Sequence, residues 1–118
     1  MSEYVDAGAE MNQVVLRGRV TGPPTGRELP SGSSIVTFRV SIGREKTHMT
    51  AGSKQSSDWV DCVAWAPRLK KSVSSWRIGD TVEVGGALRR RFIRVEGGPA
   101  TSRLEVEVLK AAVVSRAL

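Results

Sequence analysis

The chain contains 118 residues, with 18 Lys and Arg against 12 Asp and Glu, and its formal charge is +6. This length predicts a single domain, and the positive charge favours nucleic acid or another polyanion as the partner. A single cysteine excludes an internal disulfide framework, and no apolar run reaches the roughly 20 residues needed to cross a membrane.

The N-terminal stretch MSEYVDAGAE is acidic and lacks the basic region of a secretory signal peptide. We expect residues 1–11 to form a flexible extension and residues 12–115 to form the domain. These features predict a cytoplasmic protein with no membrane contact.

The first predicted strand covers residues 13–20, where apolar and polar side chains alternate. Successive residues of a strand point to opposite faces. Val14 and Leu16 therefore share an inward face, and Arg17 and Arg19 point outward.

Residues 22–34 are rich in Pro, Gly and Ser, which predicts a long turn. Alternation resumes over residues 35–42, where Phe38 is expected to point inward and Arg39 outward. Residues 43–57 are polar and contain few large apolar side chains, so we expect a mobile loop.

The third predicted strand, residues 58–65, reads DWVDCVAW and holds two of the three tryptophans. Trp59, Asp61 and Trp65 share its outward face, and the small residue Cys62 points toward the core. We expect the carboxylate to pair with a neighbouring arginine, because an unpaired acid there would repel phosphate.

The pattern changes after this strand. Residues 67–79 place apolar side chains on one face of a helix, with Gly79 positioned to end it. Trp76 lies on this face and is expected to belong to the core. Strands are expected again over residues 80–95, with a bulge at its two central glycines, and over residues 103–114.

Three strands, a helix and two more strands form the element order of the OB-fold. The sequence thus predicts an all-β protein, a five-stranded Greek-key barrel with one short helix between strands 3 and 4. Rings can stack on unpaired bases while cations follow the phosphates, so the outward face is expected to bind single-stranded nucleic acid. Its predicted members are Arg17, Arg19, Arg39, Trp59, Trp65, Arg89, Arg91 and Ile93.

The chain also resembles the bacterial single-stranded DNA-binding proteins. The stretches that carry the resemblance are MNQVVLRGRV, the PSG turn before IVTFRV, SDWVDCVAW and RIGDTVEVGGALRRR, and they span roughly residues 11 to 114. The resemblance implies that Trp59 and Trp65 occupy base-stacking positions. It also implies a homotetramer that binds single-stranded DNA without sequence preference in replication, recombination and repair.

Three departures from the family's pattern are visible. Lys46 stands where the family commonly has an aromatic residue, and Ile93 stands at another such position, with Phe92 on the opposite face unless the bulge shifts the register. The chain ends in VVSRAL, so the acidic tail of many members is missing and no C-terminal tail domain is expected. The resemblance therefore indicates a short paralogue whose binding depends more on charge.

Catalysis has little support in the sequence. His48 and Cys62 make a weak nucleophile–base pair, and no zinc-site spacing or phosphate-binding loop occurs. We expect no enzyme activity, cofactor, metal or small-molecule substrate. Two alternatives stay open, an RNA-binding OB-fold and a primosome-like protein-interaction subunit whose tryptophans are covered by a partner.

Overall fold

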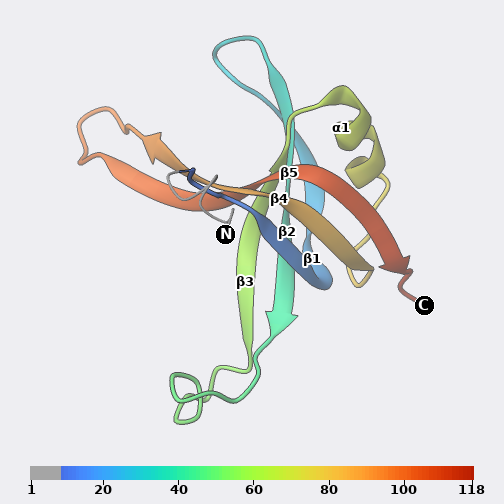
Figure 1. Ribbon diagram of the computed structural model, residues 1–118. Coiled ribbons are helices and arrows are strands. Elements are labelled where there is room, and N and C mark those ends of the chain that lie inside the picture. Colours follow the sequence, from blue (N-terminus) through green and yellow to red (C-terminus); the bar gives the residue numbers. More distant parts are fainter. Residues whose placement is uncertain (1–8) are drawn as a thin grey trace.

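The computed structural model describes residues 9–118, so most of the extension expected at residues 1–11 lies outside the described part. The chain forms a closed barrel in which the strands follow the order β1-β2-β3-β5-β4. This arrangement confirms the predicted five-stranded fold with one helix before the fourth strand (Figure 1). The elements are β1 (Val14–Glu28), β2 (Ser34–Gly43), β3 (Ser57–Ala64), α1 (Pro67–Ser74), β4 (Thr81–Ile93) and β5 (Thr101–Ser115).

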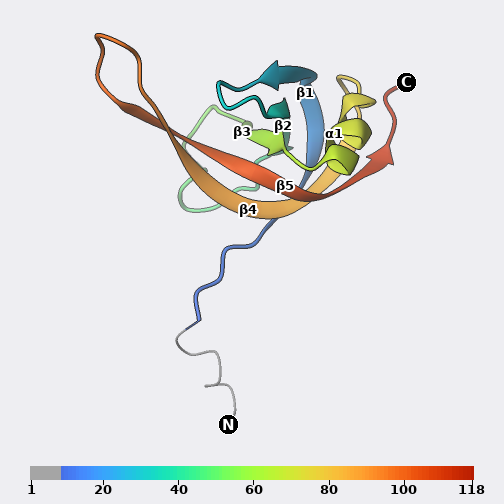
Figure 2. The same ribbon diagram turned by 90° about the horizontal axis from the view of Figure 1, so that it is seen from above.

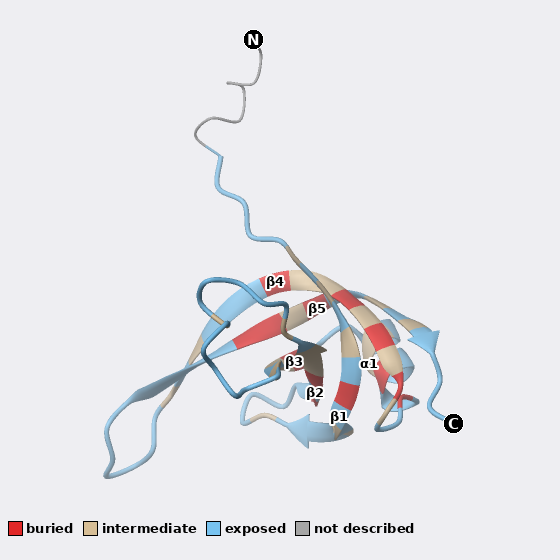
Figure 3. Ribbon diagram, turned by 90° about the horizontal axis from the view of Figure 1, so that it is seen from below, coloured by how far each residue is buried: buried red, intermediate tan, exposed pale blue. Residues whose placement is uncertain are grey.

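The core consists of the inward side chains of all five strands, together with Val73 of α1 and Trp76, and is rich in valine. Burial is concentrated in the barrel, as the red segments of Figure 3 show. Trp76 is 5% exposed, and its ring meets that of Phe38 edge-on with centroids 5.2 Å apart. The prediction that Trp76 belongs to the core is confirmed.

The first strand is longer than the sequence predicts. We expected a turn over residues 22–34, but β1 continues to Glu28 and residues 25–28 pair with the start of β2. The two prolines fall between Gly22 and Thr25, where the register shifts and fewer ladder hydrogen bonds are lost. The turn itself covers only residues 29–33 and uses Gly32 at φ +92°.

The helix is shorter than its apolar spacing indicates. We expected residues 67–79, but α1 ends at Ser74, and a turn then carries Trp76 into the core. The hydroxyls of Ser74 and Ser75 donate to backbone carbonyls of the last turn, at 2.6 and 2.8 Å. Such local bonds compete with helix continuation.

A bulge is present at the two predicted glycines, but it belongs to β5 and not to the strand over residues 80–95 in which we expected it. Gly85 lies opposite Lys110 and Gly86 opposite Val108, so the extra residue, Leu109, belongs to β5. The alternation within β4 is therefore uninterrupted. A side chain at Gly86 would overlap the backbone carbonyl of Glu107, which explains the need for glycine there.

Strands β4 and β5 continue beyond the barrel as a hairpin that projects to one side (Figure 2). Strand β5 pairs with β3 only at Val106 and Glu107, so residues 101–105 have β4 as their single neighbour. This hairpin has two faces. Its front face carries Arg89, Arg91 and Ile93 of β4 with Arg103 and Glu105 of β5, and its reverse face carries Leu88, Arg90 and Phe92 with Ser102 and Leu104.

Candidate nucleic-acid interface

The outward surface of β2 and β3 combines a ring, a cation and a carboxylate. The guanidinium of Arg39 lies 3.9 Å from the ring centroid of Trp59, and its Nε donates to Asp61 Oδ1 at 3.0 Å. The pairing predicted for Asp61 is confirmed. The indole is still 57% exposed, so the guanidinium covers only part of it and leaves ring surface in solvent.

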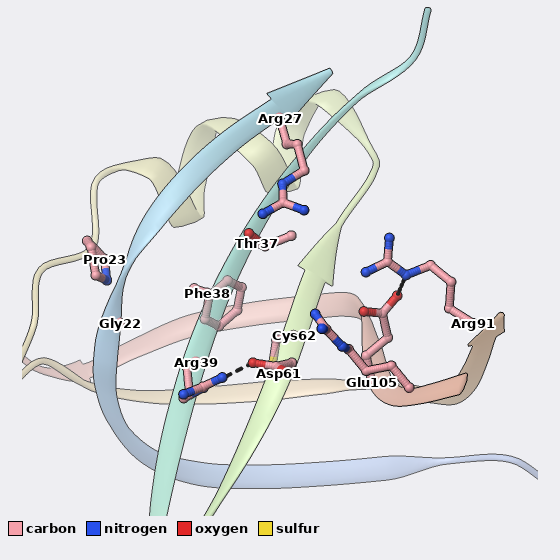
Figure 4. A pocket seen from close by; sticks show the side chains of 11 residues that line it. Gly22, Pro23, Arg27, Thr37, Phe38, Arg39, Asp61, Cys62, Arg91 and Glu105 are labelled. Carbon is pink, nitrogen blue, oxygen red and sulfur yellow. Dashed lines mark hydrogen bonds and ion pairs between the residues drawn. The ribbon is translucent and has the colours of Figure 1, made fainter. Parts of the chain in front are cut away.

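A groove lies between this surface and the projecting hairpin. Figure 4 shows Arg39 and Asp61 on one side of it, Arg91 and Glu105 on the other, and Arg27 above. Arg103 of β5 also lines it. Four arginines thus surround two carboxylates in a groove that is open to solvent, an arrangement that favours an anionic ligand.

The hairpin repeats the arrangement that holds Arg39. The Nε of Arg89 donates to Glu107 at 3.0 Å, and the Nε of Arg91 lies 3.2 Å from Glu105 Oε1. In the part of the chain that the structure describes, the terminal nitrogens of these arginines donate no hydrogen bond to a protein group. The inner nitrogens of Arg39 and Arg89 donate hydrogen bonds to carboxylates, and Arg91 forms an ion pair with Glu105. The outer edges of the three guanidinium groups therefore remain available to a phosphate.

Two other arginines are bound more completely. Arg17 directs both Nε and a terminal nitrogen to Glu83 Oε2, at 3.1 and 2.9 Å. Arg44 forms two bonds to separate oxygens of Asp58, at 2.9 and 2.7 Å, and these bonds hold the pKa of the Asp58 carboxyl below its usual value. These pairs join neighbouring segments and leave fewer donors for a ligand.

The remaining predicted residues are distributed around the barrel. Arg19 is exposed and lies opposite Ser41, whose other neighbour is Trp59, so it belongs to the same row of outward side chains. Trp65 is 44% exposed but follows the end of β3. Six residues of extended chain place the Cα atoms of the two tryptophans up to roughly 20 Å apart, too far for one base to contact both indoles.

The predicted outward face is not continuous between the tryptophans. Val63 is 3% exposed, at the point where β5 pairs with β3. Lys46 is exposed in the loop between β2 and β3. Ile93 lies on the front face of the hairpin, opposite Thr101, and Phe92 points the other way, as the uninterrupted alternation requires.

Sequence reasoning missed two arginines of the groove. Arg27 lies in the part of β1 that we expected to be a turn, so its outward direction could not be assigned. Arg103 begins the predicted last strand and lies directly opposite Arg91. Its alternation with the apolar Leu104 was a usable signal.

Cys62 is fully buried, and loss of solvent around the thiol, with smaller effects of Asp61 and Glu105, raises its pKa to about 12. A thiol with this pKa remains protonated at neutral pH and is a poor nucleophile. The structure agrees with the predicted role of Cys62 as a small core residue.

Comparison with protein families identifies the chain. The model of the single-strand binding protein family matches residues 11–114. The chain belongs to this family. The match covers every strand and the helix apart from the last residue of β5, so the groove and the hairpin fall inside the family domain.

Two relatives and one solved structure illustrate the similarity. The chain is 28% identical over 97 residues to single-stranded DNA-binding protein A of Bacillus subtilis, a match that covers 82% of this chain and 55% of that protein. It is 30% identical over 81 residues to single-stranded DNA-binding protein 2 of Listeria innocua, covering 69% and 50%. The chain thus spans about half the length of these relatives.

The structure titled "Plasmodium falciparum SSB complex with ssDNA" superimposes with a TM-score of 0.72 and 22% identity, over 90% of this chain and 95% of that one. At this identity the likeness establishes the fold.

Within residues 9–118, no helix is long and apolar enough to cross a membrane.

Proposed function

We propose that the protein binds single-stranded DNA without sequence preference and performs no catalysis. The observation that carries this proposal is the groove lined by four arginines, one of which, Arg39, also lies over the exposed indole of Trp59. The other three are Arg27, Arg91 and Arg103. Membership in the single-strand binding protein family and the names of the relatives support it.

The chemistry of the groove accounts for the absence of sequence preference. An indole can stack on any base, and guanidinium groups contact phosphates that are identical along the strand. Because unpaired bases expose their faces, this surface discriminates against duplex DNA, whose bases are already stacked. We therefore expect protection of single strands during replication, recombination and repair, in the cytoplasm and at the nucleoid.

Residues 12–115 form the proposed binding domain, and its site residues divide into two groups. Trp59 and Trp65 stack on bases, with Ile93 adding an apolar contact. The cationic group contacts phosphates, and Arg17 contributes less because Glu83 already occupies two of its nitrogens. Its members are Arg19, Arg39, Arg89, Arg91, Lys46 and, as additions from the structure, Arg27 and Arg103.

We further propose that the protein acts as a homo-oligomer, a tetramer by resemblance to its family. Residues 14–18 of β1 pair with β4, and pairing with β2 begins only at Arg19, so one edge of this segment has no strand partner within residues 9–118. The nearby outward side chains include exposed apolar residues, Val15 at 63% and Leu109 at 55%. An unpaired edge beside apolar surface favours association of identical chains.

Titration of the intrinsic fluorescence with oligo-dT tests the proposed function. Trp59 and Trp65 are exposed while Trp76 is buried, so stacking should quench part of the emission and leave the rest. Oligo-dT should quench more strongly than oligo-U, and the affinity should fall steeply with salt, by a log–log slope of about −0.7 per phosphate neutralised. Equal or stronger binding of oligo-U would favour the RNA-binding alternative, and unchanged emission with both would favour the protein-interaction alternative.

A further inference from the structure

The reverse face of the β4–β5 hairpin exposes more apolar surface than its front face. Phe92 is 72% exposed, Leu104 is 51% exposed and Leu88 is 41% exposed, and all three lie on this face beside Arg90. The outer part of the hairpin is mostly exposed, as the pale blue segment in Figure 3 shows. Most of the Phe92 ring lies in solvent, so its surface is available to a ligand.

The charges of the reverse face differ from those of the front face. On the side of the front face, Arg89 donates to Glu107 and Arg91 forms an ion pair with Glu105. The reverse positions of the described hairpin carry no carboxylate, and Arg90 directs one terminal nitrogen to the hydroxyl of Ser102 at 3.0 Å. A full positive charge therefore remains beside the exposed ring of Phe92.

We propose that the reverse face is a second contact for single-stranded DNA, in which Phe92 stacks on a base and Arg90 contacts a phosphate. A strand bound in the groove passes over the turn at residues 94–100 and continues along the reverse face. Arg94, exposed just after β4, lies at the start of this turn. The proposal rests on the proposed function, because it extends the path of the same ligand.

The charge distribution favours nucleic acid over a second copy of the chain as the occupant. A symmetric contact through this face would bring Arg90 of one copy toward Arg90 of the other, with no carboxylate on the face to compensate either charge. A phosphate compensates it directly. The combination of an open ring with a free cation is also the chemistry that single-strand binding surfaces use.

Thiol protection distinguishes the two faces in a single experiment. Because Cys62 is buried and its thiol pKa is raised to about 12, one introduced cysteine would be the reactive thiol of the chain. Ser102→Cys reports on the reverse face next to Phe92, and Thr101→Cys, its neighbour, reports on the front face next to Ile93. The rate of maleimide labelling is measured for each variant alone, with a dT oligomer of about 8 nucleotides, and with one roughly four times longer.

We expect the short oligomer to slow labelling of T101C and leave S102C reactive, and the long oligomer to slow both at least about fivefold. Protection of T101C alone, at every length, would overturn the second contact and leave the proposed function intact. Protection of neither thiol, with unquenched tryptophan emission, would overturn the proposed function itself. Slower labelling of S102C at rising protein concentration without DNA would instead assign the face to self-association.

Replacement of Phe92 provides an independent measurement. Phe92→Ala should weaken binding of the long oligomer by at least about fivefold and leave binding of the short one within about twofold, since only the long strand reaches the reverse face. Phe92→Trp keeps a flat ring and should restore the long-oligomer affinity. An equal loss with both lengths, or no loss with either, would contradict the proposal.

Discussion

Two surfaces of the barrel carry the same pair of residue types in different geometries. On the β1–β4 surface, Arg17 gives two nitrogens to one oxygen of Glu83. On the β2–β3 surface, Arg39 gives only its Nε to Asp61, and its plane lies over Trp59. Glu83 thus occupies two donors of Arg17. Asp61 instead fixes the direction of the Arg39 guanidinium and leaves its terminal nitrogens free.

This difference shows why net charge alone is a poor guide to a binding surface. Both arginines are exposed, both have a carboxylate partner, and a count of charges would treat them alike. What separates them is which nitrogens the carboxylate takes and whether a ring lies beside the pair. Removing the ring, the cation and the carboxylate in turn tests how much each contributes to DNA binding on the β2–β3 surface.

Removal of the ring should have the largest effect. Trp59→Ala deletes a stacking surface and the support of Arg39, and we expect single-stranded DNA affinity to fall by about 1–3 kcal/mol, roughly 5- to 150-fold. Trp59→Phe keeps a smaller ring and should recover most of this loss. Affinities from equilibrium titration with oligo-dT, at one fixed salt concentration, provide the measurement. If Trp59→Ala bound oligo-dT with wild-type affinity, the indole would not be part of the binding site.

Removal of the cation compares the two surfaces directly. Arg39→Ala should reduce the affinity and make the log–log salt slope shallower by about 0.7, the contribution of one phosphate. Arg17→Ala should change both quantities less, because two donors of Arg17 already bind Glu83. The measurement is the affinity of each variant over a series of salt concentrations. Equal changes in the two variants would mean that the geometry of the ion pair does not matter.

Sequence patterns predicted the fold and most strand ends, but not the full length of β1. Alternation identified four of the five strands nearly to their ends, because it directly reflects which face is buried. The extension of β1 was missed, since Pro, Gly and Ser between residues 22 and 34 are typical of a turn. Strand pairing with β2 outweighed that local preference, and Arg27 was lost from the predicted site with it.

The site was predictable in its residue types and less so in its contacts. The pairing of Asp61 followed from local reasoning, because a carboxylate on a basic face needs a partner. The pairs of Arg89 and Arg91 depend on the register between β4 and β5, which a bulge shifts and which one sequence does not reveal. The discontinuity between Trp59 and Trp65 likewise depends on where β5 meets β3.

Removal of the carboxylate distinguishes positioning from repulsion. Asp61→Asn adds one positive charge to the surface, so repulsion alone predicts tighter binding of DNA. If the carboxylate instead orients Arg39, the variant should bind more weakly, by about 1 kcal/mol or roughly fivefold, the net value of a typical hydrogen bond. The sign of the change in oligo-dT affinity decides, and tighter binding would contradict the positioning role.

Asp80→Asn is the matched control, because it makes the same change of charge away from the groove. Asp80 is 1% exposed and accepts bonds from the amides of Ala117 and Arg77 and from Arg116, at 2.8, 2.9 and 3.0 Å. These bonds, the amide of Ala117 first, lower the pKa of the Asp80 carboxyl. We expect almost no change in DNA affinity and a lower melting temperature at neutral pH.

The pH dependence of that stability follows from the direction of the shift. Because the pKa of Asp80 is lower in the folded state, the unfolded chain takes up the proton first as the pH falls. The contribution of Asp80 to the free energy of unfolding is therefore complete above the unfolded pKa of about 3.9. It is lost as the pH falls through the lower folded pKa. The melting temperatures of wild type and Asp80→Asn should therefore differ at pH 7 and converge below about pH 4. Asparagine is uncharged at every pH, so only the wild-type carboxylate can lose its charge over this range. If the difference in melting temperature stayed constant, the stabilisation would come from the shape of the side chain and not from its charge.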